Sequence, residues 1–394
     1  MQGNKSISLY DRIETVMQST GRPSPTWLRM GLYAISEVYG LGLRLRSAAY
    51  RNGMLKPLQL PCIVISIGNI TLGGTGKTPL TIYMAEMLHR RGYRVAIVSR
   101  GYGGRAEKSG AIVSDGSRIL VSAEVSGDEP YMMGQQLSGI PILVGANRYR
   151  SGKIAIKRFK PDIILLDDGF QHRRLARDLD LVLLDARRPW GNGYLFPRGG
   201  LRETPSALKR GHAIVLTRAS QGLAEPEGIL APVLRSVPYF TSQHRLKLVR
   251  VISAVSDGAT KSNKSVSGID FMFLHGKRVL VFSGIARNLE FFKLVQEVGC
   301  QIVQTMKFRD HYQYNHSDME HICKQALDQR AHYVLTTEKD FCRMSNLYQG
   351  RCDLIVVGAD MVFHDGTFDE FIADRVAALT NDKQAKMRFH NGSG

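Results

Sequence analysis

Cysteine and long apolar runs are both scarce in this sequence. The chain has 5 cysteines in 394 residues and no C-x-x-C pair, which excludes a disulfide scaffold and a zinc ribbon and favours a reducing compartment. The most apolar early stretch, residues 30–43, is interrupted by Glu37 and is shorter than the roughly 18 residues that a membrane-spanning helix needs. Residues 1–21 lack an apolar segment followed by a small-residue cleavage site, so we expect neither an export signal nor a spanning helix.

Acidic residues are few relative to basic ones. Lys and Arg total 53 against 35 Asp and Glu, which gives a formal net charge of +18. This excess predicts an anionic partner, either nucleic acid, a phosphorylated substrate or an acidic membrane surface. Hydrophobic residues at 43% and charged residues at 22% are typical of a globular chain and exclude disorder and collagen.

Apolar β-type runs alternate with helical patterns beyond residue 62. We expect strands in residues 63–67, 95–99, 163–166, 181–184 and 213–216. The alternation predicts an α/β fold with a mainly parallel sheet and helices on both faces. At about 150 residues per domain, the length also predicts more than one unit.

A stretch rich in Ser, Gly, Lys and Asn around residues 256–268 indicates a domain boundary. We therefore divide the chain into an N-terminal amphipathic segment at 1–55, an α/β core at 56–255, a linker at 256–270, a smaller C-terminal α/β domain at 271–380 and a polar tail at 381–394.

Residues 27–50 have the pattern of an amphipathic helix with basic ends. Apolar side chains recur at helical spacing and arginines flank them: Trp27, Leu28, Leu32, Ile35, Tyr39 and Leu43, with Arg29, Arg44, Arg46 and Arg51. One interpretation is a surface helix packed on the core. The other is a helix that lies in a membrane interface, with its arginines on anionic lipid.

The strongest motif follows residues 63–67. It reads Gly68-Asn69-Ile70-Thr71-Leu72-Gly73-Gly74-Thr75-Gly76-Lys77-Thr78, a strand that runs into a glycine-rich turn and then a helix. Such a turn directs backbone N–H groups at phosphate oxygens, while Lys77 reaches the β- and γ-phosphates and Thr78 can ligate Mg²⁺. We predict a P-loop NTPase-type core that binds nucleotide through residues 71–78. Thr71 departs from the pattern, which has glycine there, and an ordinary glycine turn is the alternative.

Two carboxylates end the apolar run at 163–166. Asp167 and Asp168 have the position of the metal-holding acids that accompany a P-loop, so we predict that one of them orders Mg²⁺ or its water. The alternative is a strand that ends in a solvated Asp pair.

Four further clusters have chemistry that the local pattern leaves open. Ser99-Arg100-Gly101-Tyr102-Gly103 and residues 185–203 follow expected strands, where open α/β sheets bind ligands, and their arginines suit phosphate binding. In Gly127-Asp128-Glu129-Pro130, spacing alone favours helix capping. His311, within residues 308–312, is on local pattern more often a structural residue.

Together, these motifs resemble the tetraacyldisaccharide 4'-kinase family, the lipid A 4'-kinases. The resemblance covers residues 27–357 and includes Asp167-Asp168-Gly169-Phe170-Gln171-His172, Arg198-Gly199-Gly200-Leu201-Arg202-Glu203 and Thr336-Thr337-Glu338-Lys339-Asp340. It implies a kinase with ATP and Mg²⁺ as cofactors. Such a kinase moves the γ-phosphoryl group to the 4'-hydroxyl of a tetraacylated glucosamine disaccharide 1-phosphate, forming lipid IVA at the cytoplasmic face of the bacterial inner membrane.

The resemblance also implies roles for individual residues. Asp128 and His311 form the acid–histidine pair that deprotonates the acceptor hydroxyl, and Lys77 acts on the phosphates. Substrate contacts are expected from Asn69, Arg100, Tyr102, Glu129, Arg148, Gln171, His172, Arg202 and Glu203. The expected partners are the acylated disaccharide phosphate and the anionic inner-membrane surface, which favours the interfacial interpretation of residues 27–50. No nucleic acid and no obligate protein partner are expected.

Two other classes remain open from the residues alone. A DNA-binding P-loop ATPase would also be basic, although the sequence has no recognisable DNA-reading element. A membrane adaptor without catalytic activity is the second, and phosphorylation of a disaccharide lipid would exclude it.

Overall fold

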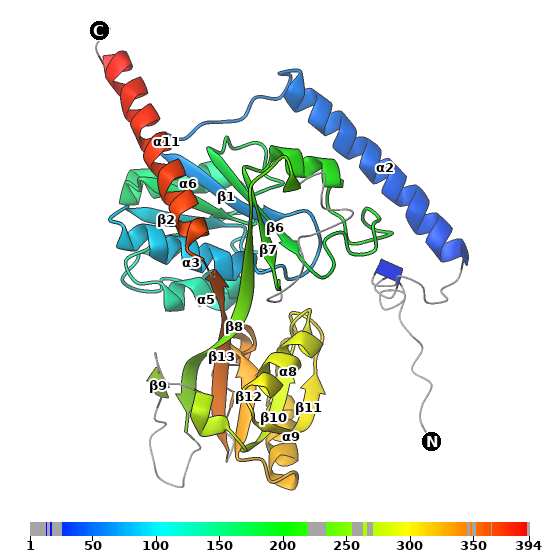
Figure 1. Cartoon of the computed structure of the whole chain (residues 1–394). Helices are drawn as coiled ribbons and strands as arrows, with labels where there is room; N and C mark the ends of the chain where they lie inside the picture. Colours follow the sequence, from blue (N-terminus) through cyan, green and yellow to red (C-terminus); the bar gives the residue numbers. More distant parts are fainter. Residues whose placement is uncertain are drawn as a thin grey trace.

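The computed structural model has two lobes, and one continuous sheet of 13 strands runs through both of them (Figure 1). The structure describes residues 13, 16–17, 26–219, 234–253, 263–265, 271–344, 347–348, 352–363 and 365–391. Most of the expected linker at 256–270 and the end of the expected tail, residues 392–394, lie outside the described residues.

The first lobe holds the parallel part of the sheet. Its strands are β1 (Ile63–Asn69), β2 (Val95–Ser99), β3 (Ala111–Ser114), β4 (Ile142–Val144), β5 (Ile163–Asp167), β6 (Leu179–Asp185) and β7 (Ala213–Thr217). Its helices are α3 (Lys77–Arg90), α4 (Ala123–Ser126), α5 (Asp128–Gln136), α6 (Arg148–Phe159) and the 3₁₀ helix η1 (Pro205–Arg210). The strand order is β7-β6-β1-β5-β2-β4-β3, and only β3 pairs antiparallel to its neighbour.

Helices cover both faces of this sheet, as the alternating sequence pattern predicted. Ile65 of β1 belongs to a core with α3 and α5, and Val64, the preceding residue, belongs to a core with α6 on the other face. Because both faces are buried, the central strands are continuous apolar runs. The prediction of a mainly parallel P-loop-type sheet is confirmed.

The second lobe is a smaller α/β unit. Its strands are β10 (Arg278–Ser283), β11 (Gln301–Lys307) and β12 (Tyr333–Thr337), which pair in the parallel order β11-β10-β12. Its helical segments are η3 (Phe271–Leu274), α8 (Asn288–Glu297), α9 (His316–Asp328) and α10 (Glu338–Met344). Helix α8 covers one face with Phe292, and α9 covers the other with Ile322.

Two long antiparallel strands connect the lobes (Figure 1). Strand β8 (Tyr239–Ile252) pairs with β7 in the first lobe, and β13 (Asp353–Phe363) pairs with β12 in the second. They pair with each other between these ends, and β9 (Asn263–Ser265) adds to β8. The sheet is therefore unbroken from one lobe to the other.

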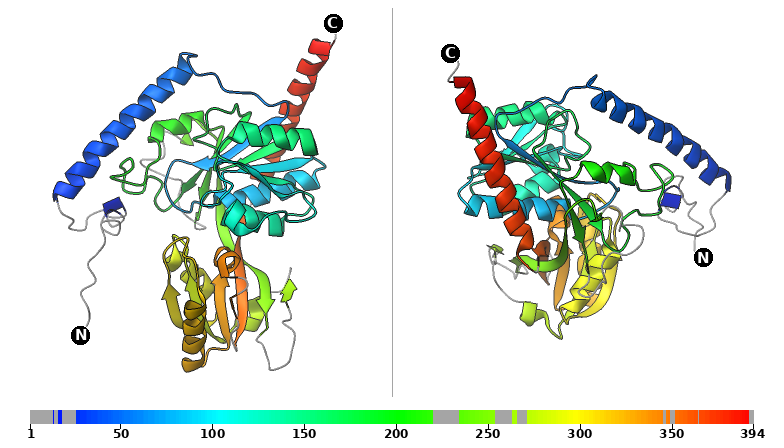
Figure 2. Two further views of the ribbon diagram at one scale, coloured as in Figure 1. Left: turned by 180° about the vertical axis from the view of Figure 1, so that it is seen from behind. Right: turned by 45° about the horizontal axis from the view of Figure 1, so that its top comes forward.

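After β13 the chain returns to the first lobe as α11 (Thr367–Asn391), seen in both views of Figure 2. Phe368, Ile372 and Val376 join the same core as Ile65. This helix begins inside the expected smaller domain and extends into the expected polar tail, so its packing assigns it to the first lobe. The other domain boundaries stay a proposal.

Helix α2 (Thr26–Arg51) lies along the outside of the first lobe (Figure 2). Its buried positions, Leu28, Leu32, Ser36 and Gly40, recur every fourth residue and make a narrow stripe. In the part of the chain that the structure describes, no helix is both long and apolar enough to cross a bilayer.

Candidate active site

The P-loop connects β1 to α3 at the carboxyl end of β1. Gly76 has a positive φ of 88°, and a Cβ there would lie 2.5 Å from His244 Nε2, so only glycine fits. The buried Asn69 amide donates a 2.8 Å hydrogen bond to the Thr75 hydroxyl. The loop is therefore held from inside by protein side chains, and Lys77 follows as the first residue of α3.

Asp167 ends β5 beside β1 and is buried. Its Oδ1 accepts a 3.2 Å hydrogen bond from the Thr81 hydroxyl, and its Oδ2 accepts a 3.0 Å bond from the Ser99 hydroxyl. Burial raises the pKa of Asp167 to about 6, and the nearby Glu129 carboxylate adds to the rise. The hydroxyls of Thr81 on α3 and Ser99 on β2 thus fix both oxygens of Asp167. This fixes the end of β5, which Asp168 directly follows.

Asp168 has the opposite electrostatic surroundings. Its Oδ1 accepts a 2.7 Å hydrogen bond from Arg202 Nη1 and lies 3.6 Å from Lys77 Nζ. Burial opposes its ionisation, but these two positive charges outweigh burial and lower the pKa of Asp168 to about 2. Asp168 is therefore the carboxylate that stays charged beside the P-loop lysine.

The oxygen donors at this edge of the sheet suit Mg²⁺. The Thr78 hydroxyl and the Asp168 carboxylate are hard donors, and Mg²⁺ in kinases is held by one or two such groups together with phosphate oxygens and water. Among the described residues, no group of three or more His, Cys, Asp or Glu side chains could hold a metal by itself. The donor set therefore fits a Mg²⁺ ion that arrives with a nucleotide.

Residues 198–203 lie directly against the P-loop. The Leu72 N–H donates to the Gly200 carbonyl over 2.6 Å, and the Arg202 N–H donates to the Ile70 carbonyl over 2.7 Å. This backbone pairing explains how Arg202, far away in the sequence, reaches Asp168.

Several of the polar side chains predicted to bind substrate form one hydrogen-bonded network beside the P-loop. Gln171 Nε2 donates to the Asn69 carbonyl over 2.8 Å and to Glu203 Oε1 over 3.2 Å. Arg210 donates to Glu203 Oε2 over 2.6 Å. Gln171 Oε1 is buried and accepts no hydrogen bond within the described residues.

Asp128 is the first residue of α5 and faces the second lobe. A Cβ on Gly127 would lie 2.8 Å from the Tyr102 carbonyl, so the turn after β2 packs directly on the start of α5. Asp128 Oδ2 accepts hydrogen bonds from His311 Nδ1 over 3.2 Å and from Arg343 Nε over 2.7 Å. The described backbone of α5 donates no hydrogen bond to this carboxylate, which argues against a capping role.

His311 follows β11 on a turn with φ of 60°, an uncommon conformation for a residue other than glycine. Its ring centroid lies 5.9 Å from that of Tyr102. Asp128 and His311 are 183 residues apart in the sequence and come from different lobes. The structure thus brings the two residues of the predicted acid–base pair into contact.

Comparison with known proteins agrees with this geometry. The sequence profile described as tetraacyldisaccharide-1-P 4'-kinase (LpxK) matches residues 28–377. The chain belongs to the tetraacyldisaccharide 4'-kinase family. A tetraacyldisaccharide 4'-kinase of Syntrophus aciditrophicus is 41% identical over 324 residues, which cover 80% of this chain and 84% of that protein.

Two further relatives span nearly the whole chain. A tetraacyldisaccharide 4'-kinase of Desulfatibacillum aliphaticivorans is 37% identical over 371 residues, which cover 94% of this chain and 98% of that protein. The crystal structure of "apo" form LpxK from Aquifex aeolicus in complex with ATP superposes with a TM-score of 0.66 at 29% identity and covers 89% of this chain and 99% of that chain. The 4'-kinase family therefore includes both lobes.

The remaining predicted substrate residues of this 4'-kinase lie at different depths. Tyr102 is 67% exposed, and Arg100 pairs at the surface with Glu107 over 2.6 Å. Glu129 accepts a 3.2 Å hydrogen bond from Lys339 of the second lobe. Tyr102 and Glu129 thus lie at the contact between the lobes, and Glu129 is also close enough to Lys77 and Asp167 to interact with their charges.

Arg148 and His172 lie deeper in the first lobe of the kinase. Arg148 is buried and donates to the Gly145 carbonyl over 3.1 Å, and burial lowers its pKa to about 10. Burial and nearby arginines lower the pKa of His172 to about 4, and its Nε2 has no hydrogen-bond partner within the described residues. His172 is thus a neutral imidazole, and within the described residues both its Nε2 and the buried Nε of Arg148 have no hydrogen-bond partner.

The sequence analysis missed Arg343 at the kinase site. This arginine lies on α10 and its side chain is 1% exposed. The available signal was its spacing, because Arg343 comes three and four residues after Asp340 and Lys339 and so shares a helix face with them.

A second missed group lies at the other end of the P-loop. Arg218, in a left-handed conformation after β7, donates to the Gly74 carbonyl over 2.8 Å and to Asp185 over 3.0 Å. Arg287 of the second lobe also pairs with Asp185. No local pattern indicates these contacts, because they join residues far apart in the sequence, and the pair of Arg287 with Asp185 forms only when the lobes meet.

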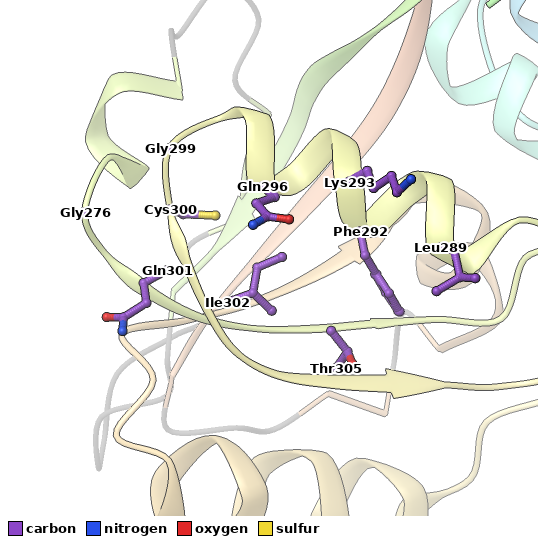
Figure 3. A pocket seen from close by; sticks show the side chains of 10 residues that line it. All are labelled: Gly276, Leu289, Phe292, Lys293, Gln296, Gly299, Cys300, Gln301, Ile302 and Thr305. Carbon is purple, nitrogen blue, oxygen red and sulfur yellow. The ribbon is translucent and has the colours of Figure 1, made fainter.

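A groove of about 710 Å³ lies between α8 and β11 in the second lobe (Figure 3). Its lining consists of Gly276, Leu289, Phe292, Lys293, Gln296, Gly299, Cys300, Gln301, Ile302 and Thr305. None of the predicted site residues of the kinase lines this groove, so it is separate from the active site.

Proposed function

We propose that this chain performs the 4'-kinase reaction of its family with ATP as phosphoryl donor, Mg²⁺ as cofactor and Asp128 as the base. The observation that carries the proposal is the combination of a P-loop with a carboxylate–histidine pair that two lobes contribute. The ATP complex of the Aquifex aeolicus relative supports the choice of nucleotide.

The P-loop half binds and orients the donor. Residues 73–76 present backbone N–H groups to the phosphates, and Lys77 neutralises charge on the β- and γ-phosphates. We assign the metal to Thr78 and Asp168, because both oxygens of Asp167 already accept hydrogen bonds. Held by these two side chains, Mg²⁺ would supply positive charge that stabilises the negative charge developing during transfer.

The second half of the site acts on the acceptor. Asp128 accepts the proton of the 4'-hydroxyl as its oxygen attacks the γ-phosphorus and ADP leaves, and His311 supports the charge on Asp128 through their hydrogen bond. A positioned base of this kind contributes about 10²- to 10⁴-fold to the rate. The arrangement therefore supplies both donor activation and acceptor activation.

Substrate binding is assigned to polar groups between the two halves. Arg202 and Gln171 each donate a hydrogen bond to Asn69 at the end of β1, whereas Glu129 follows Asp128 in the chain and the Tyr102 carbonyl lies against Gly127. A disaccharide phosphate has hydroxyl, amide and phosphate groups that match such donors and acceptors.

The outer face of α2 supports a lipid surface as the location of the reaction. Large apolar side chains point away from the protein, with Trp27 68%, Met30 67%, Val38 72% and Leu45 62% exposed. Exposed apolar side chains next to arginines are typical of a helix that lies in the interface of an anionic bilayer. We therefore place the enzyme peripherally at the cytoplasmic face of the inner membrane.

Helix α2 is also joined to the active site. Ser36 Oγ donates to the Leu195 carbonyl over 2.9 Å, and the Tyr39 hydroxyl donates to the Arg202 carbonyl over 2.8 Å. The loop at 195–202 thus connects α2 to the P-loop: it accepts hydrogen bonds from α2 and pairs through its backbone with residues 70 and 72. This connection would keep the phosphate-binding half close to a membrane-embedded substrate.

The decisive experiment is phosphate transfer to a tetraacyl disaccharide 1-phosphate in detergent micelles with labelled ATP, with and without Mg²⁺. We expect a 1,4'-bisphosphorylated product that carries the label at its 4'-phosphate, and no product after chelation of the metal. Absence of transfer with intact ATP binding would favour the membrane adaptor. Salt-sensitive binding to DNA without transfer would favour the P-loop ATPase.

A further inference from the structure

We propose that Arg343 is a positioning residue for the phosphoryl transfer: from the second lobe it holds Asp128 Oδ2, so that Oδ1 stays available to the acceptor hydroxyl. The proposal rests on the proposed role of Asp128 as base. Nothing in the motifs or in the family description assigns a role to Arg343.

Groups of the second lobe hold the Arg343 guanidinium in place. Its Nη1 donates to the Gly284 carbonyl over 3.1 Å and lies 3.4 Å from Asp340 Oδ1. Asp340 is fully buried and accepts further hydrogen bonds from the Tyr314 and Thr337 hydroxyls over 3.0 and 2.6 Å. A guanidinium held in this way projects Nε and Nη2 as a rigid pair of donors.

Both of these Arg343 nitrogens contact the same oxygen of Asp128, the proposed base. Arg343 Nε and Nη2 each lie 2.7 Å from Asp128 Oδ2, which His311 Nδ1 also approaches to 3.2 Å. Asp128 Oδ1 accepts no hydrogen bond within the described part of the chain. One oxygen is thus fixed by the second lobe and the other is free, which is the orientation that a general base needs.

Arg343 also affects when Asp128 is charged. Burial opposes ionisation, but the hydrogen bond from His311 and the charge of Arg343 outweigh burial and lower the pKa of Asp128. The other groups that face this carboxylate are Asp310 beside His311, Lys339 and Cys342 on α10, Glu129 on its own helix and Tyr102 on the adjacent turn. Without Arg343, the pKa of Asp128 is lowered less and the carboxyl is protonated at higher pH.

The test compares Arg343→Gln and Arg343→Lys with the parent in steady-state kinetics and pH–rate profiles. For Arg343→Gln we expect kcat to fall about 10- to 100-fold, since one support of the base is lost. KM for ATP should stay within about twofold, and the acid limb of the profile should move to higher pH. Arg343→Lys keeps the charge but loses the paired donors, so it should restore the acid limb and only part of kcat.

Tyr348→Phe is the matched control, because it removes a 2.7 Å hydrogen bond to the Cys352 carbonyl inside the second lobe and leaves the hydrogen bonds of Asp340, Arg343 and Asp128 in place. We expect this variant to lose some thermal stability and to keep the parent's pH profile. If Tyr348→Phe lowers kcat and moves the acid limb as Arg343→Gln does, Arg343 only stabilises the second lobe. If Arg343→Gln does not fold, an unchanged kcat in Arg343→Lys contradicts the proposal, and a reduced kcat with a normal acid limb supports it.

Asp128→Asn separates this proposal from the proposed function. If Asp128→Asn keeps its turnover, Asp128 is not the base and the proposed mechanism fails with it. If Asp128→Asn is slow but Arg343→Gln matches the parent in kcat and pH profile, only the positioning role fails. The double variant should be no slower than Asp128→Asn alone, because residues that act as a unit are not additive.

Discussion

The two halves of the active site are built in opposite ways. The phosphate-binding half lies in the first lobe, and its loop is one continuous stretch of sequence braced by Asn69 and by backbone pairing with Gly200. The acid–base half joins Asp128 and His311 across 183 residues and two lobes. The first half is complete within one lobe, whereas the second exists only while the lobes are in contact.

The contact between α5 and α10 decides whether the second half exists. Four side-chain pairs connect the described residues of these helices: Asp128 with Arg343, Glu129 with Lys339, Gln135 with Cys342, and Gln136 with Glu338. The difference between the two halves of the site implies that a nucleotide can bind without the contact between the lobes, but that phosphoryl transfer to a hydroxyl requires this contact. An arrangement of this kind ties the acid–base step to the approach of the second lobe.

The largest effect is expected from a change in the local half. Lys77→Ala should reduce transfer by about 10³-fold or more, because the cation beside Asp168 is the group that offsets charge on the β- and γ-phosphates. Turnover and ATP binding should both be measured. Arg90→Ala, at the far end of the same helix with only a surface pair to Glu86, is the control and should behave as the parent. Normal turnover in Lys77→Ala would remove the P-loop from the mechanism.

A change in the assembled half should separate binding from turnover. Asp128→Asn and His311→Ala are each expected to lower kcat about 10²- to 10⁴-fold while ATP affinity stays within about twofold. The losses should not multiply in the double variant, because the two side chains serve one proton transfer. Isothermal titration with ATP beside single-turnover kinetics measures both quantities. A large loss of ATP affinity at unchanged turnover would make Asp128 a binding residue.

The same difference explains what could be predicted from the sequence. The P-loop and the Asp167-Asp168 pair are contiguous motifs at strand ends, so local chemistry and position were enough to find them. Contacts such as Arg343 with Asp128 depend on how the lobes meet, which no local pattern encodes. The His311 pairing came only from the family resemblance.

The fold follows the same division between local and distant information. Alternating apolar runs predicted the parallel sheet, because each strand is buried on both faces. Chain order placed residues 367–380 with the smaller unit, but Phe368 packs in the core of the first lobe because β13 carries the chain back to it. In residues 27–50, helical spacing could not separate the buried stripe of Leu32 from the exposed side of Met30.

A smaller effect, on stability, is expected from a change of pH, because it alters the charge of Glu338 at the contact between the lobes. Burial raises the pKa of Glu338 to about 7, above its usual value near 4.5. The neutral form is favoured in the folded state, so this contribution to stability is complete below about pH 4.5 and is lost as pH rises through 7. Over that range it amounts to about 3 kcal/mol at most.

Glu338→Gln mimics the neutral carboxyl and can still accept the hydrogen bond from Gln136. We expect the free energy of unfolding of the parent to fall relative to the variant between pH 5 and pH 8, measured by denaturant titration at several pH values. ATP affinity should not differ between the two proteins, because Glu338 is remote from the P-loop half. Parallel pH dependences would show that Glu338 does not ionise in this range.

The smallest effect on the chemistry itself should come from the exposed side of α2. A triple change of Met30, Val38 and Leu45 to Ser removes apolar area that faces away from the protein. At about 1 kcal/mol per side chain that enters the interface, binding to anionic vesicles should weaken roughly 100-fold, and KM for micellar substrate should rise. Leu32→Ser changes the buried stripe instead and should lower thermal stability. If vesicle flotation weakens with Leu32→Ser and not with the triple variant, α2 only covers the fold, and neither half of the site is held at a lipid surface by it.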